Sequence, residues 1–282
     1  MSTHWEFTGN SHVGVDQCWR LQALLGATVS GVSGSMFASH TKLSHVMCIP
    51  VPGGIAAADA ASSFVNPLTA LGMTETMRLE GHSAIVHTAA ASNLGQMLNR
   101  LCQADGIPLV NVVRRNEQAD LLRAAGADHV VVSSADSFAD DLTAAITATG
   151  ATLAFDAIGG GEQVDTLLAS MEKASSAGQA FSRYGSDTHK QVYIYGGLDR
   201  SATTLRRTYG MSWSVGGWLL TPFLGRVGFE RMAELQARVA AEITTTFASG
   251  YADTISLDDM LDPAVAKAYS AQATGEKRLV TP

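Results

Sequence analysis

The stretch that decides the fold runs from Ser83 to Cys102 and reads SAIVHTAAASNLGQMLNRLC. Its first part, SAIVHTAA, is dominated by apolar and β-branched residues and contains no proline, which is typical of a buried strand. Its last part, QMLNRLC, repeats apolar residues at helical spacing. The turn between them, ASNLG, consists of small residues. The stretch therefore predicts a strand, a tight turn and a helix in immediate succession.

The turn matches the three small positions of the dinucleotide fingerprint G-x-G-x-x-G/A at Ala90, Ser92 and Gly95. A small turn lets the backbone N–H groups at the helix start approach a pyrophosphate, which the positive end of the helix dipole also attracts. Only the third glycine is literally present. Strand, tight turn and helix also occur in many α/β proteins that bind no nucleotide, so both interpretations stay open at this point.

A second predicted strand, Leu109–Val113, ends directly before Arg114 and Arg115. In a dinucleotide-binding fold this strand end faces the adenosine ribose, where a carboxylate selects NAD and an arginine accommodates the 2′-phosphate of NADP. Two arginines without an acid at this place favour NADP(H). The alternative is that both are solvated residues that open the next helix.

Charge and cysteine content narrow the class of protein. The net charge of the 282 residues is −7, which argues against nucleic acid or an anionic membrane as a partner. Cys18, Cys48 and Cys102 are scattered and odd in number, so they indicate neither a disulfide framework nor a structural zinc site. The first twenty residues lack the basic start and apolar region of a signal peptide. We therefore expect a cytoplasmic protein that acts on a small-molecule substrate.

Strand and helix patterns alternate after residue 82, which favours a parallel sheet covered by helices on both faces. The predicted strands are Ser83–Ala89, Leu109–Val113, His129–Ser133, Thr152–Asp156, Gln191–Tyr195 and Met211–Trp218. The predicted helices between them are Leu94–Ala104, Asn116–Ala125, Ser137–Thr149 and Gly161–Ala174.

The flanking segments predict a smaller β-domain. From Ala27 the chain alternates as short antiparallel strands do, and the following small-residue helical stretch is predicted to break at Asn66-Pro67. A long helix is predicted at Gly228–Phe247, and the tail after it is long enough to return to the β-domain. The loop with Ser182, Arg183 and Tyr184 has no role that the sequence indicates: its side chains either contact the cofactor or lie on the surface.

Six motifs in order carry a resemblance to a known family: FVNPLTALGM, HTAAASNLG, LLRAAGADHVV, FDAIGGG, VYIYGG and GGWLL. From about Leu25 onward the chain resembles the medium-chain dehydrogenase/reductases, in their zinc-free quinone oxidoreductase and enoyl-thioester reductase branch. The resemblance implies an α/β fold, a Rossmann doubly wound parallel sheet with a partial GroES-like β-domain built from both chain ends. The implied domains are 1–62 (partial GroES-like catalytic domain), 63–222 (Rossmann NADP-binding domain) and 223–282 (linking helix and return to the catalytic domain). Residues 1–22 do not match the family pattern, which implies a catalytic domain shortened at its N-terminus.

The resemblance also implies a set of cofactor contacts. The pyrophosphate would lie against the turn after the first Rossmann strand, the 2′-phosphate against the paired arginines, and the nicotinamide against residues from the outer motifs. For Trp218 plain core packing is an equal alternative. The implied cofactor-binding residues are Asn66, Thr69, Ala90, Ser92, Asn93, Leu94, Gly95, Arg114, Arg115, Ile158, Gly159, Tyr195, Gly196, Gly197, Trp218 and Leu219.

These residues lead to the expected function: an NADPH-dependent oxidoreductase that transfers hydride to a quinone, an α,β-unsaturated carbonyl compound or an enoyl thioester. Hydride transfer needs no side-chain nucleophile, and no catalytic residue is predicted. No metal site is predicted, because zinc-dependent relatives place a cysteine near Phe64–Asn66 and this chain has none there. A homodimer through the sixth Rossmann strand is expected. The alternative is a truncated cofactor-binding relative without catalytic activity.

Overall fold

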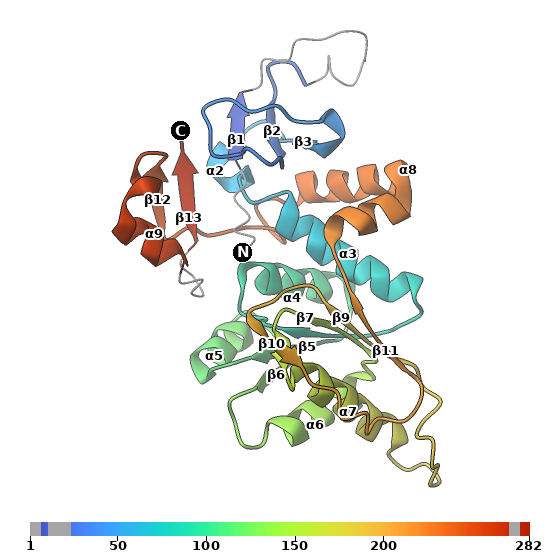
Figure 1. Cartoon of the computed structure of the whole chain (residues 1–282). Helices are drawn as coiled ribbons and strands as arrows, with labels where there is room; N and C mark the ends of the chain where they lie inside the picture. The colour runs from blue at the N-terminus through green and yellow to red at the C-terminus, as the bar shows by residue number, and fades with distance from the viewer. Residues whose placement is uncertain (1–6, 11–23, 271–276) are drawn as a thin grey trace. The chain divides into compact units, whose positions relative to one another are not determined.

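The structure is a computed structural model that describes residues 7–10, 24–270 and 277–282 (Figure 1). The chain divides into two compact units. One unit comprises the chain up to Thr69 together with Val227–Pro282, and the other comprises Ala70–Arg226. The functional domains predicted at 1–62, 63–222 and 223–282 stay predictions.

The unit Ala70–Arg226 is built on a six-stranded parallel sheet in the order β11-β9-β7-β4-β5-β6. The central strands are buried along their whole length, as expected for a parallel sheet with helices on both faces. The predicted α/β class with a doubly wound parallel sheet is thus confirmed. The strands are β4 (Ile85–Thr88), β5 (Leu109–Val113), β6 (His129–Val132), β7 (Leu153–Asp156), β9 (Lys190–Ile194) and β11 (Trp213–Gly217).

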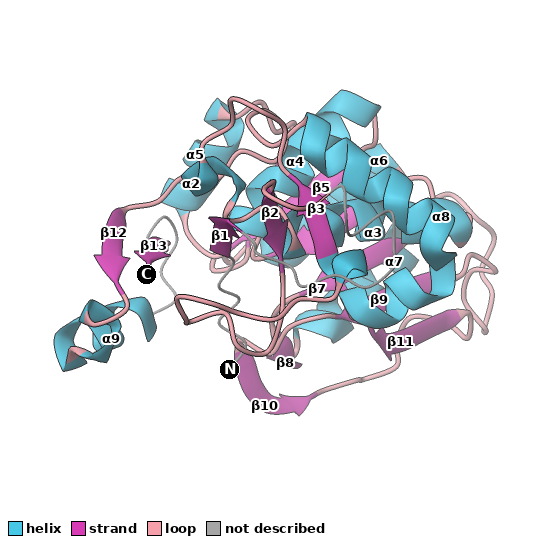
Figure 2. Cartoon of the chain, turned by 90° about the horizontal axis from the view of Figure 1, so that it is seen from above, coloured by secondary structure: helices cyan, strands magenta, loops and turns pink. Residues whose placement is uncertain are grey.

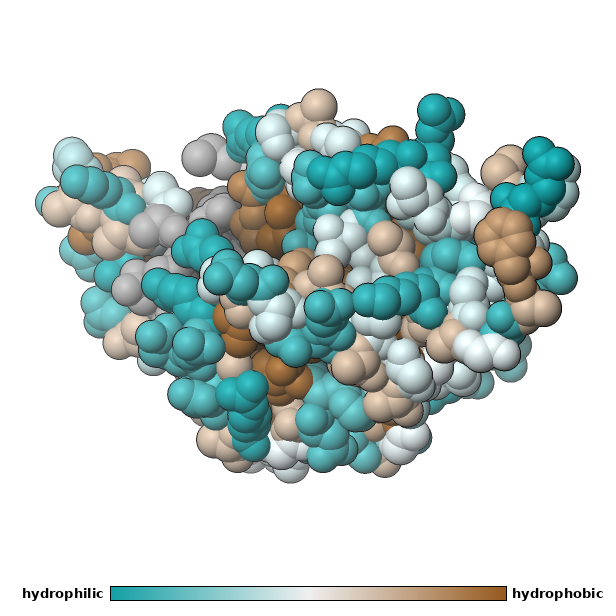
Figure 3. Space-filling view, turned by 90° about the horizontal axis from the view of Figure 1, so that it is seen from below, coloured by the Kyte–Doolittle hydropathy of each residue, from teal (hydrophilic) through white to brown (hydrophobic). Residues whose placement is uncertain are grey.

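Helices cover both faces of this sheet (Figure 1). On one face, α6 (Phe138–Thr149) and α7 (Gln163–Ser176) pack against the strands, and the space-filling view from that side is mostly hydrophilic or neutral (Figure 3). On the other face lie α4 (Asn93–Asp105) and α5 (Asn116–Ala124). The core between the sheet and the first pair of helices includes Val86, Val110, Val192, Leu142, Ile146, Leu167 and Met171, all buried.

The structure adds a pair of short strands outside the six-stranded sheet (Figure 2). These are β8 (Gly159–Gly161) and β10 (Asp199–Thr203), which run parallel to each other. These strands were not predicted, because a glycine triplet carries no strand pattern. A Cβ on Gly160 would lie only 2.8 Å from the side chain of Asp199 and 2.8 Å from the backbone carbonyl oxygen of Ser201, so the close pairing depends on glycine at this position.

The other unit contains the small sheets. Its antiparallel strands are β1 (Phe7–Asn10), β2 (Thr28–Gly31) and β3 (Cys48–Pro50), and its parallel pair is β12 (Asp253–Ser256) with β13 (Arg278–Thr281). Short helices connect them: η1 (His45–Met47), α2 (Ala57–Ala60), η2 (Asp259–Leu261) and α9 (Pro263–Ser270). Its GroES-like character stays a prediction. Apart from 7–10, the residues 1–22 that do not match the family pattern lie outside the described part of the chain.

Two predicted helix boundaries were wrong. The helical stretch does not break at Asn66-Pro67: α3 (Val65–Leu79) includes Pro67 in its first turn, where a helix needs no N–H donor. The interruption lies earlier, after α2. The predicted helix Gly228–Phe247 is the second part of α8 (Leu220–Ala241) and ends earlier, at Ala241; Gly228, with φ 80° and ψ 171°, forms the kink that separates it from the first part.

Within the described residues, no helix combines the length and the apolar character needed to span a bilayer.

Candidate functional site

The candidate site lies where the strand order of the parallel sheet reverses. From β4 the chain proceeds to β5 and β6 on one side, then returns to β7 on the other side of β4. In open α/β sheets, ligands bind outside the carboxyl ends of the strands at such a switch point. Most of the sequence-predicted site residues follow the carboxyl ends of β4, β5, β7 and β9.

The turn after β4 is held in a tight conformation. Ala89 has a positive φ of 51°, and the N–H of Ala90 donates to the carbonyl of Val112 at 3.1 Å. Ser92 is the N-cap of α4, and its hydroxyl accepts a hydrogen bond from the N–H of Gly95 at 3.1 Å. A Cβ on Gly95 would lie 2.1 Å from the carbonyl oxygen of Ala90. Glycine at position 95 is therefore required for the helix start to pack directly on the turn.

A buried carboxylate joins the ends of β4 and β7. The hydroxyl of Thr88 donates to Asp156 Oδ1 at 2.7 Å and accepts from the N–H of Ala157 at 2.8 Å. The N–H groups of Ile158 and Gly159 donate to the same carboxylate, at 3.2 and 2.8 Å. Thr88 and Asp156 were not among the predicted site residues, although the motif FDAIGGG contains the aspartate. Their hydrogen bonds fix the backbone of Ile158 and Gly159, two residues that were predicted to bind the cofactor.

The segments after β7 and β9 are in direct contact. The N–H of Tyr195 donates to the carbonyl of Asp156 at 2.9 Å. A Cβ on Gly196 would lie 2.7 Å from the carbonyl oxygen of Ala157, and Gly159 has a positive φ of 82°. The structure therefore brings Ile158–Gly159 and Tyr195–Gly197 together, and the glycines allow the backbones to approach closely.

His87 is a third residue of this region that was not among the predicted site residues. It is fully buried in β4, its Nε2 lies within hydrogen-bond distance, 2.7 Å, of the hydroxyl of Tyr195, and the two rings stack with centroids 5.6 Å apart. Burial lowers the pKa of His87 to about 3, so its imidazole is neutral at physiological pH. Burial, with the charge of Asp156 as a lesser cause, raises the pKa of Tyr195 and keeps the phenol protonated. The only feature of the sequence that could have pointed to His87 is its position as a titratable residue inside the apolar run SAIVHTAA.

Arg114 and Arg115 are both exposed at the end of β5. Their backbone N–H groups donate to Gln118 Oε1, at 3.1 and 3.2 Å, which fixes the start of α5. Within the described part of the chain, neither guanidinium has a carboxylate partner. Both cations are therefore available to an external anion.

The remaining predicted residues have different surroundings. Asn66 and Thr69 lie in the first turns of α3, in the part of this helix that belongs to the other unit. The indole N–H of Trp218 donates to Thr76 Oγ1 at 3.1 Å, and its ring meets the edge of Phe155 at 5.8 Å. These are packing contacts, and a contact of Trp218 with the nicotinamide stays a prediction. Leu219 is exposed.

The donor set fits a dinucleotide phosphate. The helix start at Ser92 presents backbone N–H groups, glycines at 95, 159 and 196 leave room for close approach, and two arginines carry uncompensated positive charge. Among the described residues, no group of three or more His, Cys, Asp or Glu side chains is arranged to hold a metal ion.

Replacement of Gly95 by alanine is expected to disrupt the turn. The new Cβ would overlap the backbone of Ala90, which cannot move away as a flexible side chain would. We expect a loss of about 3 kcal/mol or more in the free energy of unfolding, measured by urea denaturation. Gly53→Ala is the matched control, because open space surrounds Gly53 and its φ is not positive. Equal stability of the two variants would contradict the assigned packing.

Replacement of His87 by glutamine is expected to flatten the acid side of the stability profile. The unfolded chain binds a proton at His87 with a pKa near 6.5, whereas the folded chain does so only near 3. Stability from this group is therefore present above pH 6.5 and is lost as pH falls toward 3, by up to about 1.4 kcal/mol per pH unit. Urea unfolding of both proteins between pH 7 and pH 4.5 measures the two slopes. Parallel slopes would show that folding does not lower the pKa of His87.

Comparison with known proteins supports the fold independently. No family model matches the chain, and no curated protein matches it in sequence. Solved structures do match. A putative NADPH:quinone reductase from Mesorhizobium loti is 25% identical, with a TM-score of 0.79 over 99% of this chain and 77% of that one. Quinone oxidoreductase from Escherichia coli, solved in complex with NADPH, is 18% identical, with a TM-score of 0.74 over 99% and 81% of the chains.

A third solved structure, the CurK enoyl reductase, is 17% identical and has a TM-score of 0.67 over 98% of this chain and 78% of that one. These proteins represent both branches that the sequence motifs resemble. The Escherichia coli structure holds the cofactor that the paired arginines predict. The chain therefore has the fold of the quinone oxidoreductases and enoyl reductases of the medium-chain dehydrogenase/reductase superfamily.

Proposed function

We propose that the chain is an NADPH-dependent oxidoreductase of the zinc-free medium-chain type, which transfers hydride to a quinone or to an α,β-unsaturated carbonyl compound, including an enoyl thioester. The observation that carries the proposal is the pair of unpartnered guanidinium groups of Arg114 and Arg115 beside the glycine-dependent turn at Ser92–Gly95. A dinucleotide with a 2′-phosphate offers anionic groups to both places. The solved relatives with this fold support the reaction class.

Each part of the site has a distinct role in the proposal. The pyrophosphate binds the N–H groups at the start of α4, in the turn from Ala90 through Ser92, Asn93 and Leu94 to Gly95. Arg114 and Arg115 bind the 2′-phosphate. Ile158, Gly159 and the segment Tyr195–Gly197 line the cofactor along its length. Asn66, Thr69, Trp218 and Leu219 are proposed for the nicotinamide end. NADPH, when bound, supplies the hydride, and the chain's residues bind and orient it.

The buried titratable groups suit a site for a polyanion. The carboxylate of Asp156 is saturated by the hydroxyl of Thr88 and by two backbone N–H groups. His87 stays neutral because burial lowers its pKa to about 3. The protein therefore holds these groups as fixed structural partners, and the proposed phosphate contacts come from the helix start and from the two arginines.

Replacement of both Arg114 and Arg115 by glutamine tests the cofactor assignment. Loss of two charge-assisted contacts is expected to weaken NADPH binding by about tenfold or more and to leave NADH binding unchanged. Binding of each cofactor is measured by fluorescence titration, followed by oxidation of NADPH with 1,4-benzoquinone and with a 2-enoyl thioester in the same cuvette. Equal weakening of NADPH and NADH would refute the assignment.

The same measurement on the unmodified chain separates the two functions under consideration. NADPH binding with turnover of a quinone or an enoyl thioester supports the reductase. NADPH binding without turnover in either class supports the alternative, a cofactor-binding relative without catalytic activity.

The proposal includes a cytoplasmic homodimer joined through β11, with a partial GroES-like catalytic domain formed from both chain ends. Cys48 and Cys102 are free thiols, which suits a reducing compartment. Among the described strands, β11 is the last in the sheet order and pairs only with β9. The backbone N–H of Trp218 donates to the carbonyl of Ile194 in β9, and the carbonyl of Ser212 accepts from the N–H of Lys190 in β9. Since backbone groups alternate along a strand, Val215 directs its N–H to the open edge of the sheet.

Val215→Pro is expected to convert the proposed dimer into a monomer. Proline removes a donor from the open edge, where the partner strand would pair, and leaves the donors toward β9 in place. Light scattering after size-exclusion chromatography measures the molar mass, and Val215→Thr is the control that keeps the N–H. A monomeric unmodified chain, or a dimeric Val215→Pro chain, would refute pairing through β11.

A further inference from the structure

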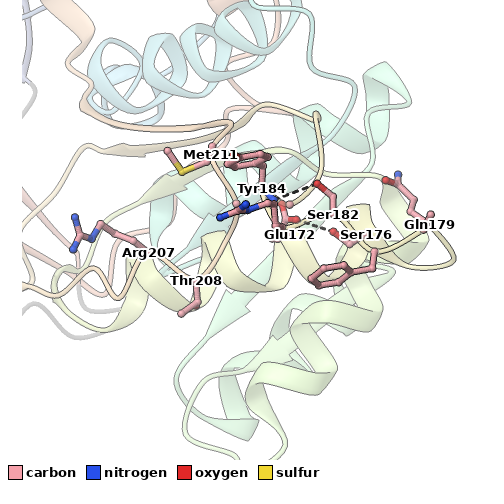
Figure 4. Close-up of a pocket in the computed structure, with 13 residues that line it drawn as sticks. Glu172, Ser176, Gln179, Ser182, Tyr184, Arg207, Thr208 and Met211 are labelled. Carbon is pink, nitrogen blue, oxygen red and sulfur yellow. Dashed lines mark hydrogen bonds between the residues drawn. The ribbon is translucent and has the colours of Figure 1, made fainter.

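A cavity lies near the amino ends of strands β9 and β11 of the same parallel sheet (Figure 4). It has a volume of about 820 Å³ and is lined by the end of α7 and by the segments 179–185 and 207–211. These two segments precede Lys190 at the start of β9 and Trp213 at the start of β11. The cavity is therefore at the amino ends of the strands, whereas the proposed cofactor site is at their carboxyl ends.

The two loops that form the cavity are joined by a close backbone contact. Gly185 and Gly210 both have positive φ angles, 79° and 70°, and a Cβ on Gly185 would lie 2.5 Å from the Cα of Gly210. The N–H of Met211 donates to the carbonyl of Tyr184 at 3.0 Å. The loops therefore have a defined shape that depends on glycine at the contact.

A buried ion pair forms the base of the cavity. The carboxylate of Glu172 accepts hydrogen bonds from Ser176, Ser186 and the ammonium group of Lys190, which is fully buried. Burial opposes ionisation of Glu172, but these hydrogen bonds outweigh it and hold the pKa of Glu172 at about 2. The negative charge in the cavity is thus already compensated by Lys190, and it does not oppose an anionic ligand.

The walls combine exposed apolar surface with a cation. Phe181, Tyr184 and Met211 are 95%, 63% and 76% exposed, an unusual concentration of large apolar side chains in loops. The guanidinium carbon of Arg183 lies 5.2 Å from the centre of the Tyr184 ring. Figure 4 shows the labelled Tyr184 and Met211 on the side of the cavity above Glu172, while the guanidinium of Arg207 is directed away from it. Arg183 is therefore the cation next to the aromatic surface.

We propose that this cavity is a second ligand site, which binds a small planar aromatic anion such as an aromatic carboxylate. The guanidinium of Arg183 pairs with the anionic group, since its planar array of donors matches a carboxylate. The ring of the ligand lies against Tyr184 and Phe181, whose exposed faces gain from burial. This assignment accounts for the loop with Ser182, Arg183 and Tyr184, for which the sequence indicates no role, and it does not depend on the proposed reductase activity.

Calorimetric titration of the full chain with 2-naphthoate tests the proposal. We expect saturable binding of one molecule per chain, and binding weaker by about tenfold for 2-naphthalenemethanol, which has the same rings without the charge. NADPH is not expected to displace either probe.

Variants locate the binding. Arg183→Gln is expected to reduce the affinity for 2-naphthoate by about tenfold, and Tyr184→Ala to reduce it severalfold. Arg200→Gln, which changes an exposed arginine on β10 outside the cavity, is the matched control and is expected to leave the affinity unchanged. Thermal unfolding of each variant verifies folding, since the replaced side chains are exposed. Absence of saturable binding, displacement by NADPH, equal binding of the uncharged analogue, or unchanged affinity of Arg183→Gln would each overturn the proposal.

Discussion

The buried carboxylate of Asp156 is the interaction on which the proposed cofactor site depends. It ties the end of β7 to the end of β4 through the hydroxyl of Thr88, at the place where the strand order reverses. A carboxylate without partners at this depth would be strongly unfavourable, so the N–H groups of Ile158 and Gly159 must turn toward it. The conformation of the loop after β7 follows from that requirement, and the segment after β9 packs on that loop.

Close backbone contacts complete the site. At Gly95 and Gly196, a Cβ would lie within 3 Å of a backbone carbonyl oxygen, and no rotamer change of a neighbouring side chain relieves such a contact. His87 and Tyr195 add a hydrogen bond between β4 and the residue that follows β9, across the strand β7 that separates β4 from β9 in the sheet. Both residues are held in their neutral forms, so this part of the site keeps its geometry over a wide range of pH.

The carboxyl ends and the amino ends of the parallel strands differ in how their charged side chains are arranged. At the carboxyl ends of the strands, Asp156 accepts hydrogen bonds from neutral donors, and the cations Arg114 and Arg115 lie on the surface. At the amino ends of the strands, Glu172 forms an ion pair with the buried cation Lys190, and Arg183 lies on the surface. Both ends of the sheet's strands thus present positive charge to solvent, in a chain whose net charge is −7. In both places the acidic group acts inside the fold, and the arginines for which we propose ligands lie on the surface.

The sequence by itself determined the α/β class and the positions of the six parallel strands, because buried strands are continuous apolar runs and the helices between them repeat at helical spacing. It also indicated the turn at Ser92–Gly95 and the paired arginines, because these features are local. It misplaced the helix break at Asn66-Pro67, since proline in a first turn does not interrupt a helix.

Only the tertiary structure decided which distant residues meet. Thr88 and Asp156 are 68 positions apart, and His87 and Tyr195 are 108 apart, so no local pattern relates them. The pairing of β8 with β10 depends on the space that Gly160 leaves beside Asp199, which appears only when the two segments are packed together. The cavity at Arg183 likewise arises from two loops that the sequence keeps apart and that a contact between glycines joins.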